Sequence, residues 1–454
     1  MNMNDFGFIV MFGWVPAVIC IFKQIPARKA VVVSFIVAWL FLPTAELKFV
    51  VGIPAYTKMA ATCCGVLLAT ILFDAKRFSS LQFGWLDLPM LIWCLCPFIS
   101  SMTNDLGWYD GISAAYTQTV AWGVPYYLGR VYLSNLEGLR NLTIGIFIGG
   151  LSYVPLCLFE SRMTFQLHQF FYGFSSGHFL TEFRYGGYRP EVFMETGLMV
   201  GAWMMAATLS GFWLWQSGAV KQLWGIPVRW LVATLAITTV LVKSTGAIGL
   251  LAVGIMILFV AKWFRNSLLV LVMIIGISIY LYDGVSGSFS GDQIVKAATT
   301  YINPDRAQSL EFRFDNEKLL SAQARERMVF GWGGWGRSRV HDPRTGKDIS
   351  VTDSLWIITF GTTGIIGLIS LTASLLLPVA VFVKRYPASL WFNNKVAPAA
   401  AIAVLIVLYT VDCLLNAMLN PVYTVACGGL TGLMLGQTDN LSKVMRVHLP
   451  VTGR

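Results

Sequence analysis

Long apolar segments alternate with short polar segments along most of this chain. The apolar segments run for about 16–23 residues between basic or Gly/Pro-rich stretches, as helices that cross a bilayer require. Since helices satisfy their own backbone groups in lipid, the pattern predicts an all-α, polytopic membrane helix bundle. We predict thirteen spans, near residues 5–22, 30–45, 57–73, 87–102, 111–132, 141–160, 190–212, 228–242, 246–263, 267–283, 354–383, 397–417 and 421–436.

Two segments between predicted spans are too long to be simple connections. They are residues 161–189 and residues 284–352, and the second has helix-like stretches and a Gly-rich turn. A structureless loop of that length is unusual, so we expect 284–352 to fold over the outer mouth of the bundle. The chain then divides into transmembrane residues 1–283, with about ten spans, the partly helical extracytoplasmic loop 284–352, and the C-terminal spans and short tail, 353–454.

Composition agrees with a membrane location. Of the 454 residues, 56% are hydrophobic and only 12% are charged, with a mean hydropathy of +0.65. Soluble domains average about 25% charged residues, so soluble enzymes, disordered chains and nucleic-acid binders are excluded. The net charge of +10 comes from short basic clusters between apolar segments, such as Lys76 and Arg77 or Lys384 and Arg385. Such clusters mark cytoplasmic loops, and we expect a bilayer but no nucleic acid as a partner.

The same clusters predict an orientation. They fall on the inner side when the N-terminus is outside and the C-terminus is cytoplasmic. Lys23 follows the first apolar segment instead of preceding it, which is the reverse of a cleavable signal peptide. This first segment is therefore expected to remain, although an interfacial position would fit it as well as a span. All eight cysteines lie in apolar segments, where they are read as packing residues rather than as disulfides or a metal site.

The first candidate for chemistry is the start of the seventh predicted span. Pro190 suits the first position of a helix, and Arg189 precedes it. A helix N-terminus beside a guanidinium can bind phosphate. Glu191 and Glu195, four residues apart on one helical face, would repel an anion, pair with an arginine, or supply a base. Alternatively, Arg189 anchors the helix at the lipid headgroups.

The second candidate is a helix-like stretch near residues 305–329. At about 100° per residue, Arg306, Arg313 and Arg327 fall within roughly a 60° sector of such a helix. Three guanidinium groups on one face could hold a pyrophosphate or an anionic glycan. Acidic residues are interspersed among them, and on composition alone a solvated face is favoured.

A Gly-rich turn and the start of the eleventh span supply further candidates. Trp332 and Trp335 lie among glycines and suit sugar stacking or interfacial anchoring. His341 could act as a base near neutral pH, or simply be exposed. Asp353 is expected first as a helix N-cap. Asp412, within the twelfth span, marks a polar interior of the bundle.

Several common motifs are not found in the sequence. It has no phosphate-binding loop of the nucleotide-hydrolase type, no Gly-x-Ser-x-Gly, and no His, Cys and Asp spacing typical of metal ligands. We therefore expect no ATP-driven step, no metal site and no cofactor.

Several of these motifs occur in a recognisable order. The sequence Lys-Ser-Thr-Gly-Ala at 243–247 lies between two spans. Ser-Leu-Glu-Phe-Arg at 309–313 and Phe-Gly-Trp-Gly at 330–333 lie in the long loop, and Gly-Ile-Ile-Gly at 364–367 follows Asp353. Together with Arg189 and Pro190, these motifs resemble the O-antigen ligase and polymerase family of bacterial membrane proteins. The resemblance touches roughly residues 185–370.

The resemblance implies a glycosyltransferase with a GT-C-like multi-span fold in the bacterial cytoplasmic (inner) membrane. Such an enzyme moves a glycan from undecaprenyl pyrophosphate to an acceptor hydroxyl on a glycan or glycolipid at the outer surface, in surface or exopolysaccharide biosynthesis. It needs neither a metal nor a nucleotide sugar. Ligation to lipopolysaccharide and polymerisation of another polysaccharide both fit.

The resemblance also assigns roles to the candidate residues. Arg189 and Arg313 would bind the pyrophosphate, assisted by Arg327. Thr245 replaces the family's turn arginine, so Lys243 is left to supply that charge, as a point charge rather than a bidentate fork. The base would be His341, with Asp353 and Glu195 as alternatives, while Trp332 and Trp335 contact the glycan.

We therefore predict that Arg189 and Arg313 line one outward-opening cavity beneath the long loop. A transporter or flippase for a lipid-linked or polar solute is the alternative, and a non-catalytic assembly partner is a third reading. The chain shows no internal repeat of the kind usual in secondary transporters.

Overall fold

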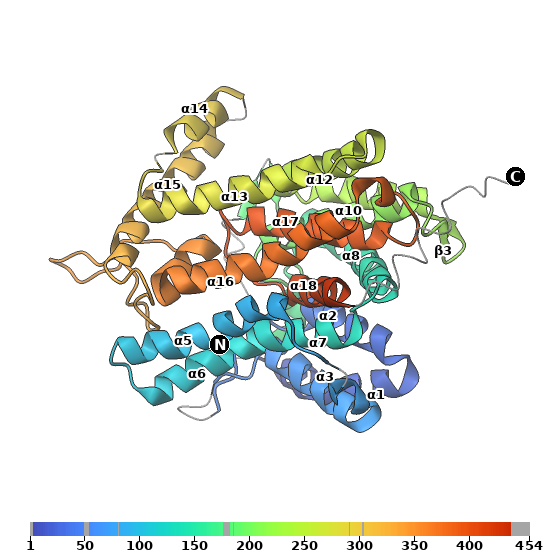
Figure 1. Ribbon diagram of the computed structural model, residues 1–454, viewed down its shortest axis with the longest axis horizontal. Helices are drawn as coiled ribbons and strands as arrows, with labels where there is room; N and C mark the ends of the chain where they lie inside the picture. Colours follow the sequence, from blue (N-terminus) through green and yellow to red (C-terminus); the bar gives the residue numbers. More distant parts are fainter. Residues whose placement is uncertain are drawn as a thin grey trace, which may run out of the picture.

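The computed structural model describes residues 3–49, 54–79, 81–175, 182–184, 186–289, 291–301 and 304–436. These residues form a bundle of helices, in which strands are confined to two short hairpins (Figure 1). The tail at 437–454, predicted to be cytoplasmic, lies outside the described residues.

Each of the thirteen predicted spans contains at least one helix. In chain order these helices are α1 (Asp5–Gln24), α2 (Ala27–Phe41), α3 (Lys58–Asp74), α5 (Leu88–Thr103), α6 (Trp108–Gln118) continued by α7 (Val124–Tyr132), α8 (Leu136–Met163), α10 (Gly197–Gln216), α11 (Val228–Leu241), α12 (Thr245–Phe264), α13 (Leu268–Ser286), α16 (Leu355–Arg385), α17 (Ala397–Asp412) and α18 (Pro421–Leu435).

Further elements connect these helices; all are short except the 22-residue α15. They are α4 (Lys76–Ser79), the 3₁₀ turns η1 (Trp85–Asp87) and η4 (Ala388–Leu390), the π-helical turn η2 (Thr119–Gly123) between α6 and α7, α9 (Leu167–Tyr172), α14 (Asp292–Tyr301), α15 (Pro304–Arg325), and the hairpins β1 (Phe183–Arg184) with β2 (Gly187–Tyr188) and β3 (Gln222–Leu223) with β4 (Ile226–Pro227).

The bundle has the helices of a multi-pass membrane protein. Among the described residues, seven helices are long and apolar enough to cross a bilayer: α1, α5 with η1, α8, α10, α12, α13 and α16. The helices α11, α17 and α18 are equally apolar in character but shorter. The predicted all-α membrane bundle is therefore confirmed.

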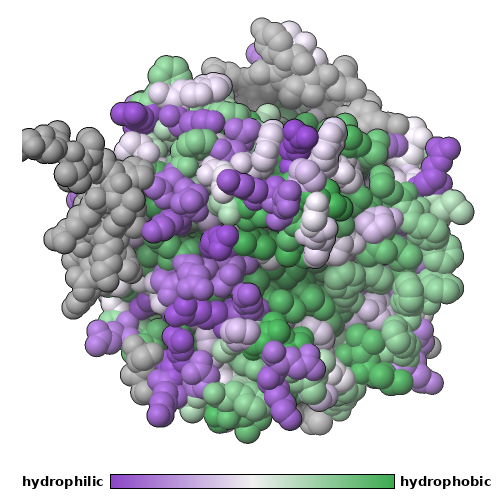
Figure 2. Space-filling view, turned by 90° about the vertical axis from the view of Figure 1, so that its right-hand side faces the viewer, coloured by the Kyte–Doolittle hydropathy of each residue, from purple (hydrophilic) through white to green (hydrophobic). Residues whose placement is uncertain are grey.

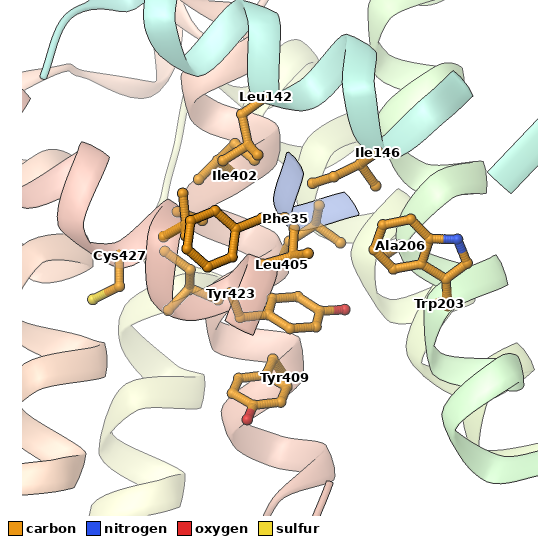
Figure 3. Close-up of a cluster of buried hydrophobic side chains, with 14 of the residues drawn as sticks. Phe35, Leu142, Ile146, Trp203, Ala206, Ile402, Leu405, Tyr409, Tyr423 and Cys427 are labelled. Atoms are coloured by element: carbon orange, nitrogen blue, oxygen red, sulfur yellow. The ribbon is translucent and has the colours of Figure 1, made fainter. Parts of the chain in front are cut away.

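The core lies where α17 and α18 pack against α2, α8 and α10 (Figure 3). Phe35, Leu142 and Trp203 meet there, and Tyr409 and Tyr423 stack with their ring centres 4.2 Å apart. A side chain on Gly428 would collide with the backbone of α7, so α7 and α18 touch through their main chains. Small residues permit such close helix packing in membranes.

Loops that alternate along the chain gather at opposite ends of the bundle. At the end that carries α15, Asn104 Nδ2 donates to Gly331 O at 2.8 Å, and Arg313 Nη1 donates to Leu415 O at 2.8 Å. At the end that carries β3, Arg140 Nη2 donates to Ala219 O at 3.1 Å. The two ends are at the left and the right of Figure 1. Figure 2 faces the β3 end, where hydrophilic side chains gather over the middle.

Helix α16 is interrupted, although the sequence predicted one continuous span. Gly364 has φ 69° and ψ −165°, a conformation that only glycine adopts readily. Residues 328–333 run beside the break: Ile365 N donates to Met328 O at 2.8 Å, and Trp332 N donates to Gly361 O at 2.8 Å. The long loop thus enters the bundle and satisfies backbone groups that the break leaves open.

Candidate functional site

The predicted site residues lie at the α15 end of the bundle, but in several separate clusters. The first joins Arg189 and Lys243. The Arg189 guanidinium forms an ion pair with Glu182 at 3.0 Å and donates to the carbonyl of Lys243 at 3.3 Å. The Lys243 ammonium packs over Gly187, where a side chain would displace it. Arg189 is only 3% exposed. Its contacts with Glu182 and with the carbonyl of Lys243 join the β1–β2 hairpin to the α11–α12 turn.

The helix start predicted at Pro190 is wrong. Helix α10 begins at Gly197, and Thr196 is its N-cap, with Oγ1 accepting from Met199 N at 3.3 Å. The segment before it is not helical, since Val192 has a φ of 54°, outside the helical region. Glu160 accepts hydrogen bonds from the backbone of Glu191, at 2.8 Å, and of Val192. Arg189 therefore does not stand beside a helix N-terminus.

Glu191 is buried within this cluster. It is 4% exposed, and its Oε1 has no hydrogen-bond partner among the described residues. Burial, together with the nearby carboxylates of Glu182 and Glu160, raises the pKa of Glu191 to about 8. Glu191 is therefore largely protonated at neutral pH.

The second cluster surrounds Arg313 on α15. Its Nη1 donates to Leu415 O at 2.8 Å and to Asn416 Oδ1 at 3.1 Å, and its Nε lies 3.7 Å from Asp353 Oδ2. Asn416 in turn donates to Asp412 at 2.8 Å. The expected N-cap role of Asp353 is wrong, because Ser354 occupies the N-cap position of α16. Arg313 thus joins α15 to the start of α16 and to the α17–α18 loop.

Glu317 lies one turn beyond Arg313 on α15, and its carboxylate is buried. In the sequence it is one of the acidic residues interspersed among the arginines, on a face expected to be solvated. It accepts hydrogen bonds from Tyr280 at 2.7 Å, Ser354 at 2.8 Å and Trp356 at 3.0 Å. Burial raises the pKa of Glu317, and these three donors and Arg313 oppose the rise. The four-residue spacing from Arg313 was the available signal that this face of α15 is turned toward the bundle.

The predicted three-arginine face does not form. Helix α15 ends at Arg325, so Arg327 lies in the following turn, where its guanidinium is 5.3 Å from the Trp332 ring centre. The side chain of Arg306 lies outside the described residues. Trp335 is 80% exposed, and His341 is exposed in a backbone bridge with Asp348.

A cavity of about 340 Å³ opens at this end between α2, α3, α6, α10 and the α17–α18 loop. Lys58 lies in its wall, 8% exposed, with Nζ 4.5 Å from the ring centre of Trp39. The exposed carboxylates of Glu46 and Glu195 line the same cavity, and Glu195 exerts an electrostatic attraction on Lys58. We call this the charged cavity. Sequence reasoning missed Lys58, which stands at the start of a span like an ordinary interfacial lysine.

A second cavity, of about 400 Å³, lies between α5, α6 and α16. Trp93, Gln118 and Thr359 line it, together with Gly334 of the Gly-rich turn. It borders the charged cavity, because Thr117 and Leu419 line both cavities.

The two predicted arginines, Arg189 and Arg313, do not line either of these two cavities. In the described part of the chain, the residues that Arg189 contacts are not those that Arg313 contacts. Ala417 and Leu419, close along the chain to the groups that Arg313 binds, do line the charged cavity. Glu195 is thus the predicted site residue that reaches it.

Metal-binding groups and cysteine thiols are the other chemistry that the sequence brought into question. Within the described ranges, no group of three or more His, Cys, Asp or Glu side chains is arranged to hold a metal ion. The eight cysteines are free thiols, of which Cys20 and Cys64 are exposed.

No protein-family model matches this chain, and no curated protein matches it in sequence. The candidate site is therefore defined by geometry: a charged cavity with Lys58 and Glu195, an adjoining cavity, and the Arg313 cluster that holds the loop beside both.

Proposed function

We propose that this chain is a membrane glycan transferase of the O-antigen ligase and polymerase type. Its donor would be a glycan on undecaprenyl pyrophosphate, and its acceptor a hydroxyl of a glycan or glycolipid. The observation that carries the proposal is the charged cavity, where the Lys58 ammonium and the Glu195 carboxylate line one hollow at the end of a membrane helix bundle. The motif resemblance from 185 to 370 supports it.

These two groups suit the chemistry of glycosyl transfer. The acceptor oxygen attacks the anomeric carbon, and the bond from that carbon to the pyrophosphate oxygen breaks, so the pyrophosphate leaves with the electron pair. Glu195 would take the acceptor proton as general base. Lys58 would stabilise the negative charge that develops on the leaving group, because its buried ammonium is a fixed positive charge in the cavity wall. The products are a new glycosidic bond and undecaprenyl pyrophosphate.

The arginines take a different place in this proposal. Arg189 is held by Glu182, and Arg313 by Leu415, Asn416 and Asp353. These partners hold Arg189 in a buried pair and fix Arg313 against the α17–α18 loop. We assign Arg313 to positioning the α17–α18 loop beside the charged cavity.

We further propose that all thirteen predicted spans cross the membrane, with the α15 end outside. Lys76 and Arg77 lie in the α3–α5 connection, and Lys384 and Arg385 end α16. Both pairs belong to the β3 end, which would be cytoplasmic because Lys and Arg are enriched in cytoplasmic loops. The charged cavity would then open to the outer side of the bacterial cytoplasmic membrane.

A transporter or flippase is the second candidate, and two observations favour it. Helix α16 is broken at Gly364, and the π-helical turn η2 lies beside both cavities. Broken helices and π-helical turns are frequent at substrate sites of transporters and other membrane proteins. This candidate predicts solute uptake or lipid translocation by the purified chain in vesicles.

The transferase proposal is tested in cells that lack the chromosomal copy of the gene and carry a plasmid copy. Glu195→Gln and Lys58→Met should each remove the surface polysaccharide on a gel while the protein level in the membrane stays normal. Glu326→Gln and Lys48→Met are matched controls, because both side chains are exposed and neither lines the charged cavity. Normal polysaccharide with Glu195→Gln would refute the proposal.

A further inference from the structure

The cavity between α5, α6 and α16 differs in chemistry from the charged cavity beside it. No residue that lines it is ionisable, whereas Lys58 and Glu195 line its neighbour. Its walls combine the rings of Trp93 and Trp122 with serine, threonine and glutamine side chains. We call it the neutral cavity. An ionic ligand would be buried there without a counter-charge, which is strongly unfavourable.

Three polar groups of residues in these walls have no hydrogen-bond partner among the described residues: Trp93 Nε1, Gln118 Nε2 and Thr359 Oγ1. Trp93 is 4% exposed and Thr359 is 1% exposed. Buried polar atoms in native proteins are nearly always paired, so three such atoms around one cavity need partners from a ligand or from water. All three can donate, and small rotations of these side chains toward the cavity would let a ligand with several oxygen acceptors satisfy them.

The two cavities are separated by one continuous stretch of helix. Along the end of α6 and the turn η2, Val120 and Ala121 face the charged cavity, while Gln118 and Trp122 face the neutral cavity. Thr117 borders both, and Leu419 stands opposite it in the α17–α18 loop. A ligand long enough to pass these two residues would place a neutral part in one cavity and its reacting group in the other.

We propose that the neutral cavity binds an uncharged sugar unit of the glycan whose reaction takes place in the charged cavity; this inference rests on the proposed function. Sugar rings present one apolar face that stacks on indole rings, and hydroxyl oxygens that accept from amide, indole and hydroxyl donors. The volume of about 400 Å³ falls within the range of small-ligand pockets. Gln118 and Thr359 would then help to select the sugar.

Binding can be measured without transfer. Ala114→Cys, at a residue that lines the neutral cavity but is not a proposed sugar contact, is prepared in protein in which the exposed Cys20 and Cys64 are replaced by serine. The purified protein reacts with methyl methanethiosulfonate, alone or with oligosaccharides released by mild acid from the host's surface polysaccharide. At about ten times Kd, the oligosaccharide should slow modification about tenfold, because only about a tenth of the sites stay free. Sugar-free undecaprenyl pyrophosphate should not slow it. Protection by that lipid alone, or by neither probe, would overturn the inference.

A second variant fills the cavity. A Cβ on Gly334 would meet no atom within 4 Å, so the first side-chain atom of Gly334→Phe has room, and the ring would be directed into the cavity that Gly334 lines. Its effect should be loss of transfer with a normal unfolding temperature, and in the Ala114→Cys protein it should abolish protection by the oligosaccharide. Gly249→Phe on α12 is the matched control, since a Cβ there also meets open space. Full transfer by Gly334→Phe would contradict the inference.

The failures of the two proposals are distinguishable. Glu195→Gln should abolish transfer but leave protection of Ala114→Cys intact, because Glu195 does not line the neutral cavity. If Glu195→Gln still transfers glycan, the proposed reaction falls while sugar binding stands. If Glu195→Gln is inactive and the oligosaccharide gives no protection, the reaction stands and the sugar site falls.

Discussion

Arg313 donates a hydrogen bond to the backbone carbonyl of Leu415 at 2.8 Å, although the two residues are 102 positions apart in the chain. The same Nη1 reaches Asn416 Oδ1 at 3.1 Å, and Nε faces Asp353. Leu415 belongs to the loop whose Leu419 stands between the charged and neutral cavities. One guanidinium from the long loop thus fixes a wall of both cavities.

Arg313→Lys should therefore lower transfer activity about tenfold or more, although the positive charge is kept. A lysine ammonium is a point charge and cannot reproduce the planar set of donors that serves three partners. Surface polysaccharide at equal protein level is the measurement. Arg339→Lys is the control, since Arg339 pairs with Asp348 on the exposed part of the loop, and exposed pairs contribute about 0–1 kcal/mol. Equal activity of Arg313→Lys and the unchanged protein would exclude the positioning role.

The helices were largely predictable from the sequence, whereas their interruptions were not. A run of apolar residues of bilayer length can satisfy its backbone in lipid only as a helix. The hydropathy pattern therefore predicted a helix in each of these segments, and each contains one. Gly364 and the turn at Thr119–Gly123 lie inside such runs, where glycine is common and has no local signature. The break at Gly364 depends on residues 328–333, which reach it only in the folded chain.

The candidate site was predictable only in part, for a similar reason. Glu195 and Arg313 could be singled out because charged residues near spans are rare. Their partners could not, because Lys58 and Leu415 are distant in sequence from them. Arg189 shows the opposite error: its neighbours favoured a phosphate site, yet Glu182 neutralises it in a buried pair.

The proposed orientation can be tested with two exposed tryptophans at opposite ends. Trp335 is 80% exposed at the α15 end, and Trp224 is 66% exposed in the β3–β4 turn. In the protein with serine at positions 20 and 64, Trp335→Cys should react with a membrane-impermeant maleimide added to the outer face of the cytoplasmic membrane in spheroplasts. Trp224→Cys should react only after the membrane is broken. The reverse pattern would invert the topology and place the charged cavity in the cytoplasm.

Gly364→Ala should destabilise the protein by about 2 kcal/mol or more. The φ of 69° is unfavourable for any residue with a Cβ, and that Cβ would collide with the carbonyl of Val329. Thermal unfolding of the purified protein in detergent measures the effect. Gly246→Ala in α12 should be neutral or slightly stabilising, because its Cβ meets no atom within 4 Å and alanine favours helix. If both variants unfold at the same temperature, residues 328–333 do not constrain the break.

Glu191 should make stability decrease as the pH rises. Its folded pKa of about 8 lies above its ordinary value of 4.5, so the folded protein holds a proton that the unfolded chain releases between these two values. The contribution of Glu191 is therefore fully favourable below about pH 4.5 and is lost as pH rises through 8. Glu191→Gln keeps a neutral side chain at every pH, and its unfolding temperature should fall less than that of the unchanged protein between pH 5 and pH 9. Glu137 is exposed at the β3 end, so the unfolding temperature of Glu137→Gln should fall with pH as much as that of the unchanged protein. If the unfolding temperature falls equally with pH in all three proteins, Glu191 ionises normally despite its burial near Glu160 and Glu182.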